Sequence, residues 1–167
     1  MNPPNSWFGQ RYPSFEDLVV LAENLGCRVG RADLGDQALF ICPETKEPPV
    51  ILLPHEGGLV ATWLLAHECG HLIHHSGPKT VLTYGRDEAR ADRWGACALI
   101  PEARIRLYKN ASEDSFIGAL SANYEDLPLE DCPIRSLAGK IARIRLQDMS
   151  NLVVNIADHQ NQYPIQK

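Results

Sequence analysis

Apolar and polar positions recur with different periods along this 167-residue chain, and each period predicts a different kind of element. The first clear pattern covers residues 14–26. Ser14 and Asp17 stand at capping-box spacing, and apolar residues then recur every three or four positions. This pattern predicts a helix that begins after Ser14 and ends at Gly26.

Three apolar segments after this helix are too short for helices and are bounded by turn-forming residues. Residues 27–32 and 37–42 are predicted as two short strands joined by a turn at residues 35–36. Residues 50–53 are predicted as a third strand after a Pro-Pro pair. Together they predict a small sheet, whose edge would also allow a peptide to bind as an added strand.

The next segment, residues 59–76, is apolar on almost every side when arranged as a helix. A helix of that kind is usually buried in a core. A Gly-Gly pair stands before it and Gly77-Pro78 after it, which suits the two ends of a helix. The segment is too short and too rich in histidine to cross a membrane. It therefore predicts a helix buried in a protein core.

This helix contains His67-Glu68-Cys69-Gly70-His71, which fits the H-E-x-x-H pattern of zinc peptidases. Residues four apart share a helix face, so the imidazoles of His67 and His71 point at one spot and can hold one Zn²⁺. Glu68 lies beside that face, where its carboxylate can reach an attacking water without binding the metal. This arrangement suits metal-assisted hydrolysis.

A third ligand is expected from the following helix, which is predicted over residues 86–99 and ended by Pro101. Glu88 can bind the metal. Asp92 lies four residues on, on the same face, and can accept a hydrogen bond from the other nitrogen of a ligating histidine. Small residues at 95–98 would let this helix pack closely on the first, so the site would lie between two buried helices.

Two alternatives stay open for this second helix. Asp87 could replace Glu88 as the third ligand, although only Glu88 has an aspartate one turn later. Asp92 could instead be a surface carboxylate that forms an ion pair with Arg90 or Arg93. Both alternatives keep the two histidines and change only what the second helix contributes.

Three further side chains near the motif are candidates for contacts with substrate or with a developing oxyanion. His74 and His75 fall in the last turn of the first helix, where cations favour the helix dipole, so they are predicted first as a C-terminal cap. Tyr84 stands just before the second helix and is predicted first as a packing residue. Contact with substrate or oxyanion is the alternative for all three.

The segments that carry these residues resemble the ImmA/IrrE family of bacterial and phage metallopeptidases. The resemblance rests on residues 66–75, 88–92 and 99–101, which contain the H-E-x-x-H motif, the E-x-x-x-D pair and an aliphatic-Pro stop. Residues 50–53 are similar to the strand that leads into the active helix of that family.

This resemblance implies a fold and a set of roles. The fold would be α+β, a minimal gluzincin-like zincin with a small sheet packed beside the active-site helix. His67, His71 and Glu88 would bind Zn²⁺, and Glu68 would be the catalytic carboxylate. The family includes peptidases that cleave helix-turn-helix repressors. The implied partner is therefore a protein substrate, such as a transcriptional repressor or an antitoxin-like regulator.

Composition narrows the setting in which such a protein would work. A net charge of −5 makes direct binding to nucleic acid unfavourable, and no signal peptide is expected. The five cysteines are scattered without a C-x-x-C pair, which is typical of reduced thiols in the cytoplasm. The sequence thus predicts a cytoplasmic protein that does not enter a membrane, and it indicates no particular oligomeric state.

The chain is expected to form one domain. Residues 1–110 would form the metallopeptidase core, and residues 111–167 a C-terminal helical extension of the same domain with a loose tail from residue 158. The helices predicted after the core site span residues 102–109, 115–124 and 136–149. The basic residues of the last helix are predicted to make a solvated face, with contact to an acidic partner or nucleic acid as the alternative.

These patterns favour a zinc-dependent endopeptidase. The alternative is a non-catalytic regulator that keeps the zincin fold and binds a repressor or toxin partner. The intact Glu68 disfavours that alternative, because a protein that only binds has no need of a general base. A purely structural zinc site is also disfavoured, since such sites usually have four protein ligands and Cys69 points away from the metal.

Overall fold

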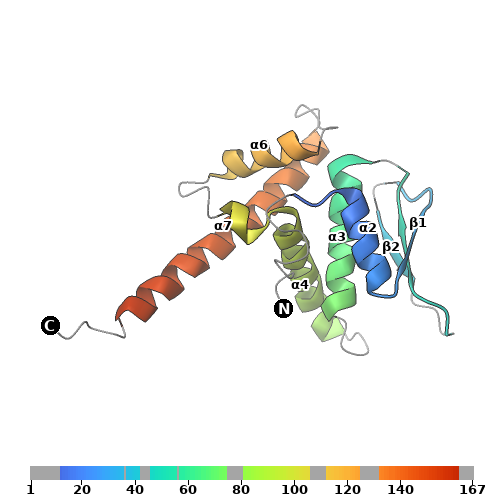
Figure 1. The fold of residues 1–167 in the computed structure, drawn as a ribbon, viewed down its shortest axis with the longest axis horizontal. Coiled ribbons are helices and arrows are strands. Elements are labelled where there is room, and N and C mark those ends of the chain that lie inside the picture. The colour runs from blue at the N-terminus through green and yellow to red at the C-terminus, as the bar shows by residue number, and fades with distance from the viewer. Residues whose placement is uncertain are drawn as a thin grey trace.

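The computed structural model describes residues 12–35, 37–41, 46–55, 57–74, 81–105, 112–124 and 132–161, which form an α+β fold (Figure 1). The α+β class predicted from the sequence is confirmed. The elements in chain order are α2 (Phe15–Asn24), β1 (Arg28–Arg31), β2 (Leu39–Ile41), β3 (Val50–Leu53), α3 (Gly58–His74), α4 (Val81–Leu99), α5 (Glu102–Ile105), α6 (Glu113–Asn123) and α7 (Cys132–Asn161). The sheet lies at one side, α2 and α3 pack against it, and α6 and α7 lie farther away (Figure 1).

Helix α2 begins where the sequence predicts. The Ser14 hydroxyl accepts a hydrogen bond from the Asp17 N–H at 3.2 Å, and the Asp17 carboxylate accepts one from the Ser14 N–H at 2.8 Å. This geometry confirms the predicted capping box. The helix ends at Asn24, and Gly26 then adopts a φ of 81°. Glycine takes this left-handed conformation without strain, so the chain can turn at once into β1.

The described strands form one sheet in the order β1-β3-β2, so the first two predicted strands do not pair with each other and both pair with the third. β1 runs parallel to β3 and β2 runs antiparallel to it, and Ile51 lies opposite both Val29 and Phe40. Burial explains this order. Ile51 and Leu53 of β3 are fully buried, whereas both ends of β1 and of β2 are exposed. The most apolar strand therefore takes the central position.

Helix α3 is the buried helix that its apolar residues predict. It packs against α2 and β3 on one side and against α4 on the other (Figure 1). Its buried residues are Leu59, Ala61, Thr62, Trp63, Leu65, Ala66, Cys69, Gly70 and His71. It begins at Gly58, one residue before the predicted start, and the residues after His74 lie outside the described part. No helix in the described residues is long and apolar enough to span a bilayer.

Helix α4 begins earlier than predicted. Its first residue is Val81 rather than residue 86, so Gly85 lies inside the helix. Tyr84 belongs to the first turns of α4 and does not precede the helix, which corrects its predicted place. A helical glycine costs only about 1 kcal/mol relative to alanine, and the packing of the rest of the helix offsets that cost. The predicted end at Leu99 agrees with the structure.

The C-terminal helices differ from their predicted bounds. α5 covers the first part of the helix predicted at residues 102–109, and residues 106–109 lie outside the described part. α6 begins two residues early because Ser112 caps it, its hydroxyl accepting a hydrogen bond from the Ser115 N–H at 3.2 Å. α7 extends the predicted helix in both directions and includes residues 158–161, which were expected to belong to a loose tail.

Helix α7 packs against α3, α4 and α6, and its basic residues do not all make a solvated face. Arg143 is exposed and pairs with Glu113 of α6 at 2.7 Å. Arg145, by contrast, is only 4% exposed. Its Nε donates to the Ile100 carbonyl oxygen at 3.0 Å and its Nη1 to Asp148 Oδ2 at 2.6 Å. The solvated-face prediction is therefore wrong for Arg145, because buried partners meet its charge and its donors.

Candidate metal centre

Three side chains from α3 and α4 bring their ligand atoms together. The Nε2 atoms of His67 and His71 lie 3.1 Å apart. Glu88 places Oε2 at 3.2 Å from His67 Nε2 and Oε1 at 3.3 Å from His71 Nε2. Among the described residues these three form a group that could hold a metal ion, with ligand atoms within 4.8 Å of one another.

The spacing of these atoms fits a zinc ion. Zinc bonds to histidine nitrogen and to carboxylate oxygen are about 2.0–2.1 Å long, so two ligands of a tetrahedral ion lie about 3.3 Å apart. The nitrogen and oxygen atoms here are 3.1–3.3 Å apart, which is close to that edge length. A set of two histidines and one glutamate also leaves the fourth tetrahedral position open, as catalytic zinc sites require.

The backbones of α3 and α4 approach closely beside these ligands. A Cβ placed on Gly70 would lie 2.8 Å from the Cα of Ala91, and one on Gly95 would lie 3.3 Å from the backbone nitrogen of His67. Because neither glycine has a side chain, α4 can pack tightly on α3 and Glu88 can reach both histidines. The sequence predicts this role for the small residues at 95–98 but not for Gly70.

The carboxylate of Asp92 lies behind His67. Asp92 Oδ1 is 3.0 Å from His67 Nδ1, the ring nitrogen that faces away from the other ligands. Both oxygens of Asp92 are also 2.8 Å from Nζ of Lys140, which comes from α7. Asp92 therefore stands between a candidate ligand on one side and a lysine of the C-terminal helix on the other.

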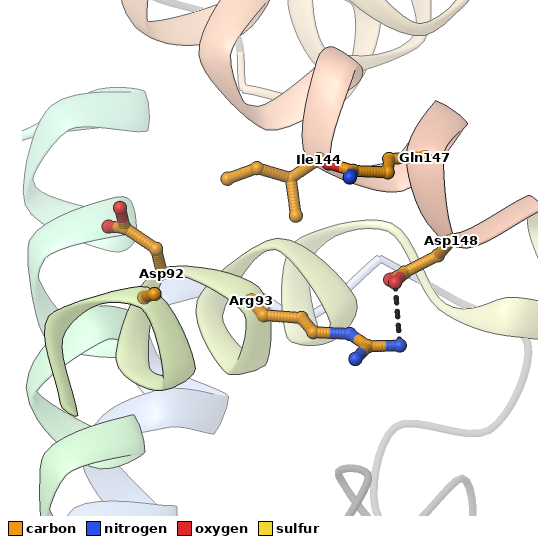
Figure 2. Close-up of a pocket in the computed structure, with 6 residues that line it drawn as sticks. Asp92, Arg93, Ile144, Gln147 and Asp148 are labelled. Carbon is orange, nitrogen blue, oxygen red and sulfur yellow. Dashed lines mark ion pairs between the residues drawn. The ribbon is translucent and has the colours of Figure 1, made fainter. Parts of the chain in front are cut away.

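The charged neighbours of Asp92 on α4 have partners of their own. Arg90 pairs with Asp87 at 3.8 Å, and Arg93 pairs with Asp148 of α7 at 2.7 Å (Figure 2). The ion pair that Asp92 forms is thus with Lys140 and not with one of the arginines considered from the sequence. Of the two candidate third ligands, the structure brings Glu88 next to the histidines and leaves Asp87 beside Arg90.

Burial and neighbouring charges set the protonation states of His67 and Asp92. Burial alone would lower the pKa of His67, but the hydrogen bond to Asp92 and the charges of Asp92, Glu68 and Glu88 raise it overall. Burial would raise the pKa of Asp92, but its hydrogen bonds to His67 and Lys140 lower it overall. An ionised carboxylate can only accept, so His67 donates through Nδ1 and keeps Nε2 for a proton or a metal cation.

Residues 22–119 match the family model described as the IrrE N-terminal-like domain, a peptidase family. The chain belongs to this family. The family predicted from the sequence is therefore confirmed, and the domain is metallopeptidase-like. Neither the curated proteins nor the solved structures contain a significant match to the chain.

The matched residues of this IrrE N-terminal-like domain include α3 and α4, and they end before α7. Glu68, the second residue of the motif, is half-buried on α3, and its charge contributes to the raised pKa values of His67 and Cys69. Cys69 is fully buried, and burial is the main reason that its pKa is raised to about 12. It is not among the residues whose ligand atoms converge.

The other predicted site residues of the domain are described only in part. His74 is the last residue of α3, but burial and the positive charge of Arg90 lower its pKa. That shift disfavours the protonated form that would stabilise a helix C-terminus. The side chain of Tyr84 is not described, and His75 lies outside the described residues altogether.

The sequence does not indicate the role of Lys140, a residue that links α7 to this site. Its Nζ lies 5.2 Å from the ring centroid of Trp63, and that ring lies 6.1 Å from the ring of His67. The sequence shows Lys140 only as one of the basic residues of an amphipathic helix. A pattern of this kind does not indicate which other helix the ammonium group will meet.

A pocket of about 300 Å³ lies on the α7 side of Asp92 (Figure 2). It is lined by residues of α4 and α7, namely Ala89, Asp92, Arg93, Ile144, Gln147 and Asp148. The three candidate ligands are not among them. The pocket therefore adjoins the candidate metal centre from behind, through Asp92, and does not form a cleft that leads to the candidate ligands.

Proposed function

We propose that this protein is a zinc-dependent endopeptidase. One observation carries the proposal: the ligand atoms of His67, His71 and Glu88 converge with the separations of a tetrahedral zinc site. Membership in a peptidase family supports it independently of that geometry. The side chain of Glu88 is 33% exposed, so the site is partly open to solvent on the side of this ligand.

The chemistry divides among the residues of the site. When bound, Zn²⁺ would lower the pKa of a water molecule and polarise the scissile carbonyl group. Glu68 takes a proton from the attacking water and delivers it to the leaving amine, as a general base and then a general acid. Asp92 holds His67 in the tautomer that presents Nε2 to the metal.

The family implies a protein as substrate. We propose that this substrate is a helix-turn-helix repressor or an antitoxin-like regulator, on the strength of the resemblance to ImmA/IrrE peptidases. We also propose that the reaction takes place in the cytoplasm. Free thiols support this setting: among the described residues, Cys27, Cys69 and Cys97 form no disulfide.

A comparison of two glutamate variants tests the proposal. Glu68→Gln should keep bound zinc but lose about 10²–10⁴-fold in the rate of cleavage of a candidate repressor, the range for loss of a general base. Glu16→Gln is a matched control, because Glu16 is an exposed glutamate on α2. It should cleave at the wild-type rate.

Two results would count against the enzyme. Unchanged cleavage by Glu68→Gln would remove Glu68 from the mechanism. Tight binding of the repressor without cleavage by the zinc-loaded wild-type chain would favour the alternative function, a regulator that keeps the fold and only binds. Elemental analysis of the same samples shows whether zinc was present in each assay.

A further inference from the structure

Lys140 makes the link between α7 and the metal centre. Its Nζ lies 2.8 Å from Asp92 Oδ1 and 2.8 Å from Asp92 Oδ2, so one ammonium group bridges both oxygens of the carboxylate. Oδ1 of the same carboxylate lies 3.0 Å from His67 Nδ1. Lys140 lies outside the residues that match the family, which end at residue 119.

We propose that Lys140 is a positioning residue for the metal centre: it holds the carboxylate of Asp92 in the orientation in which Oδ1 accepts from His67 Nδ1. The proposal rests on the zinc site proposed above and assigns to α7 a role in building that site. Lys140 would act only through Asp92 and His67, since its own contacts are with Asp92 and with the ring of Trp63.

The orientation of the Asp92 carboxylate matters because an imidazole N–H forms a good hydrogen bond only when it points at a carboxylate oxygen. A carboxylate on a flexible bond can rotate until neither oxygen lies in line with the donor, and the hydrogen bond weakens steeply when its angle falls. An ammonium group that bridges both oxygens opposes that rotation. His67 then keeps its ring plane, and Nε2 keeps its direction toward the other ligands.

The surroundings of Lys140 distinguish it from an ordinary surface lysine. Exposed ion pairs contribute little to stability, and the side chain of Lys140 is 46% exposed, so its charge alone would hold Asp92 only weakly. Its ammonium group, however, lies 5.2 Å from the ring centroid of Trp63, which is 5% exposed. A cation over an aromatic face is favourable, so the tryptophan helps to hold Nζ in place above Asp92.

The same helix offers a matched control. Arg143 lies three residues after Lys140 and also makes an ion pair of short length, with Glu113 of α6 at 2.7 Å. That pair links α7 to α6 and does not contact His67, Asp92 or Glu88. If α7 supported the site only by packing on the rest of the domain, loss of the Lys140–Asp92 pair and loss of the Arg143–Glu113 pair would change zinc affinity to a similar extent.

Zinc affinity is the measurement that tests the proposal, because it needs neither substrate nor turnover. Competition with a chromogenic chelator gives the affinity of the full chain and of each variant. Lys140→Met should weaken zinc binding about 3–10-fold, less than the 10–100-fold typical of a residue that bonds directly to a ligand. Lys140→Arg should restore most of the affinity, since a guanidinium group also binds both oxygens of a carboxylate. Arg143→Met should bind zinc as the wild type does.

A double-mutant cycle then tests whether Lys140 acts through Asp92. In an Asp92→Asn background, Lys140→Met should cause no further loss of zinc affinity. Wild-type affinity in Lys140→Met, an equal loss in Arg143→Met, or the same further loss in the Asp92→Asn background would each overturn the proposal. Because Lys140→Arg keeps the charge, its affinity also separates a positioning effect from a general loss of fold.

The zinc titrations also separate this inference from the proposed activity. A chain that binds zinc and shows the expected pattern of variants, but cleaves no repressor, would keep the role of Lys140 and lose the peptidase proposal. A wild-type chain that binds no zinc would overturn both.

Discussion

Gly70 of α3 and Ala91 of α4 pack backbone to backbone: a Cβ on Gly70 would lie 2.8 Å from the Cα of Ala91 and 3.0 Å from its carbonyl oxygen. Gly70 stands directly before His71, and Ala91 directly before Asp92. The contact therefore lies between the residues of the two helices that form the candidate metal centre. It sets how near Glu88 can come to the two histidines.

Replacing this glycine should destabilise the domain. In Gly70→Ala the new methyl group meets backbone atoms that cannot rotate away, and overpacking of this kind costs about 1–3 kcal/mol. The better helix propensity of alanine offsets at most about 1 kcal/mol of that cost. Urea denaturation of the zinc-free chain should show a lower free energy of unfolding.

Gly118→Ala is the control for that substitution. Gly118 lies in α6, and a Cβ there would meet nothing within 4 Å. The same change of residue should therefore stabilise the chain by about 0.5–1 kcal/mol, through helix propensity alone. A Gly70→Ala variant as stable as Gly118→Ala would show that the two helix backbones are not as close as described.

Asp92→Ala should reduce zinc affinity or activity by about 10–100-fold, because it removes the acceptor that orients His67. The candidate ligand atoms of His67, His71 and Glu88 would all remain in this variant. The measurement is a zinc titration against a chelator, with Asp114→Ala as control, since Asp114 is an exposed aspartate on α6. If the zinc titration curve of Asp92→Ala coincides with that of the wild type, Asp92 serves only as the ion-pair partner of Lys140.

Removing the metal should lower the thermal stability of the chain. Zinc at about 100 times its dissociation constant stabilises a native state by about 2.7 kcal/mol. For a domain of this size that corresponds to a rise in Tm of about 5–10 °C. The rise should be absent from the His67→Ala/His71→Ala double variant, and a rise of equal size there would place the bound zinc elsewhere.

Two described cysteines should be slow to react in the folded chain. Burial is the main cause that raises the pKa of Cys69 to about 12 and that of Cys97 to about 11. The thiolate is the reactive form, so at pH 8 each should be alkylated at least about 100-fold more slowly than in the unfolded chain. The rates should still be rising at pH 10, where an ordinary thiol has levelled off. Pulse alkylation followed by peptide mass spectrometry measures both, and rapid labelling of Cys69 would contradict its burial.

Some features of this protein could be predicted because they depend on residues that are close in sequence. The capping box of Ser14 and Asp17 and the pairing of His67 with His71 follow from helix periodicity, and the structure contains both geometries. The buried character of α3 follows from the distribution of its apolar residues. The bounds of α4 were predicted less well, because the packing of a long helix can outweigh a glycine such as Gly85.

Other features were decided only when the elements packed together. An apolar pattern shows that a strand or a helix face is buried, but not against which partner it is buried. The central place of β3, the burial of Arg145 and the bridge from Lys140 to Asp92 all depend on such partners. Lys140 and Asp92 are 48 residues apart, and they meet only because α7 crosses α4 at that point. The sequence by itself therefore determined the two helices that carry the candidate ligands and the chemistry of their side chains. The tertiary structure decided which strand is central and which distant charge supports the candidate metal centre, because those contacts arise from packing and not from local spacing.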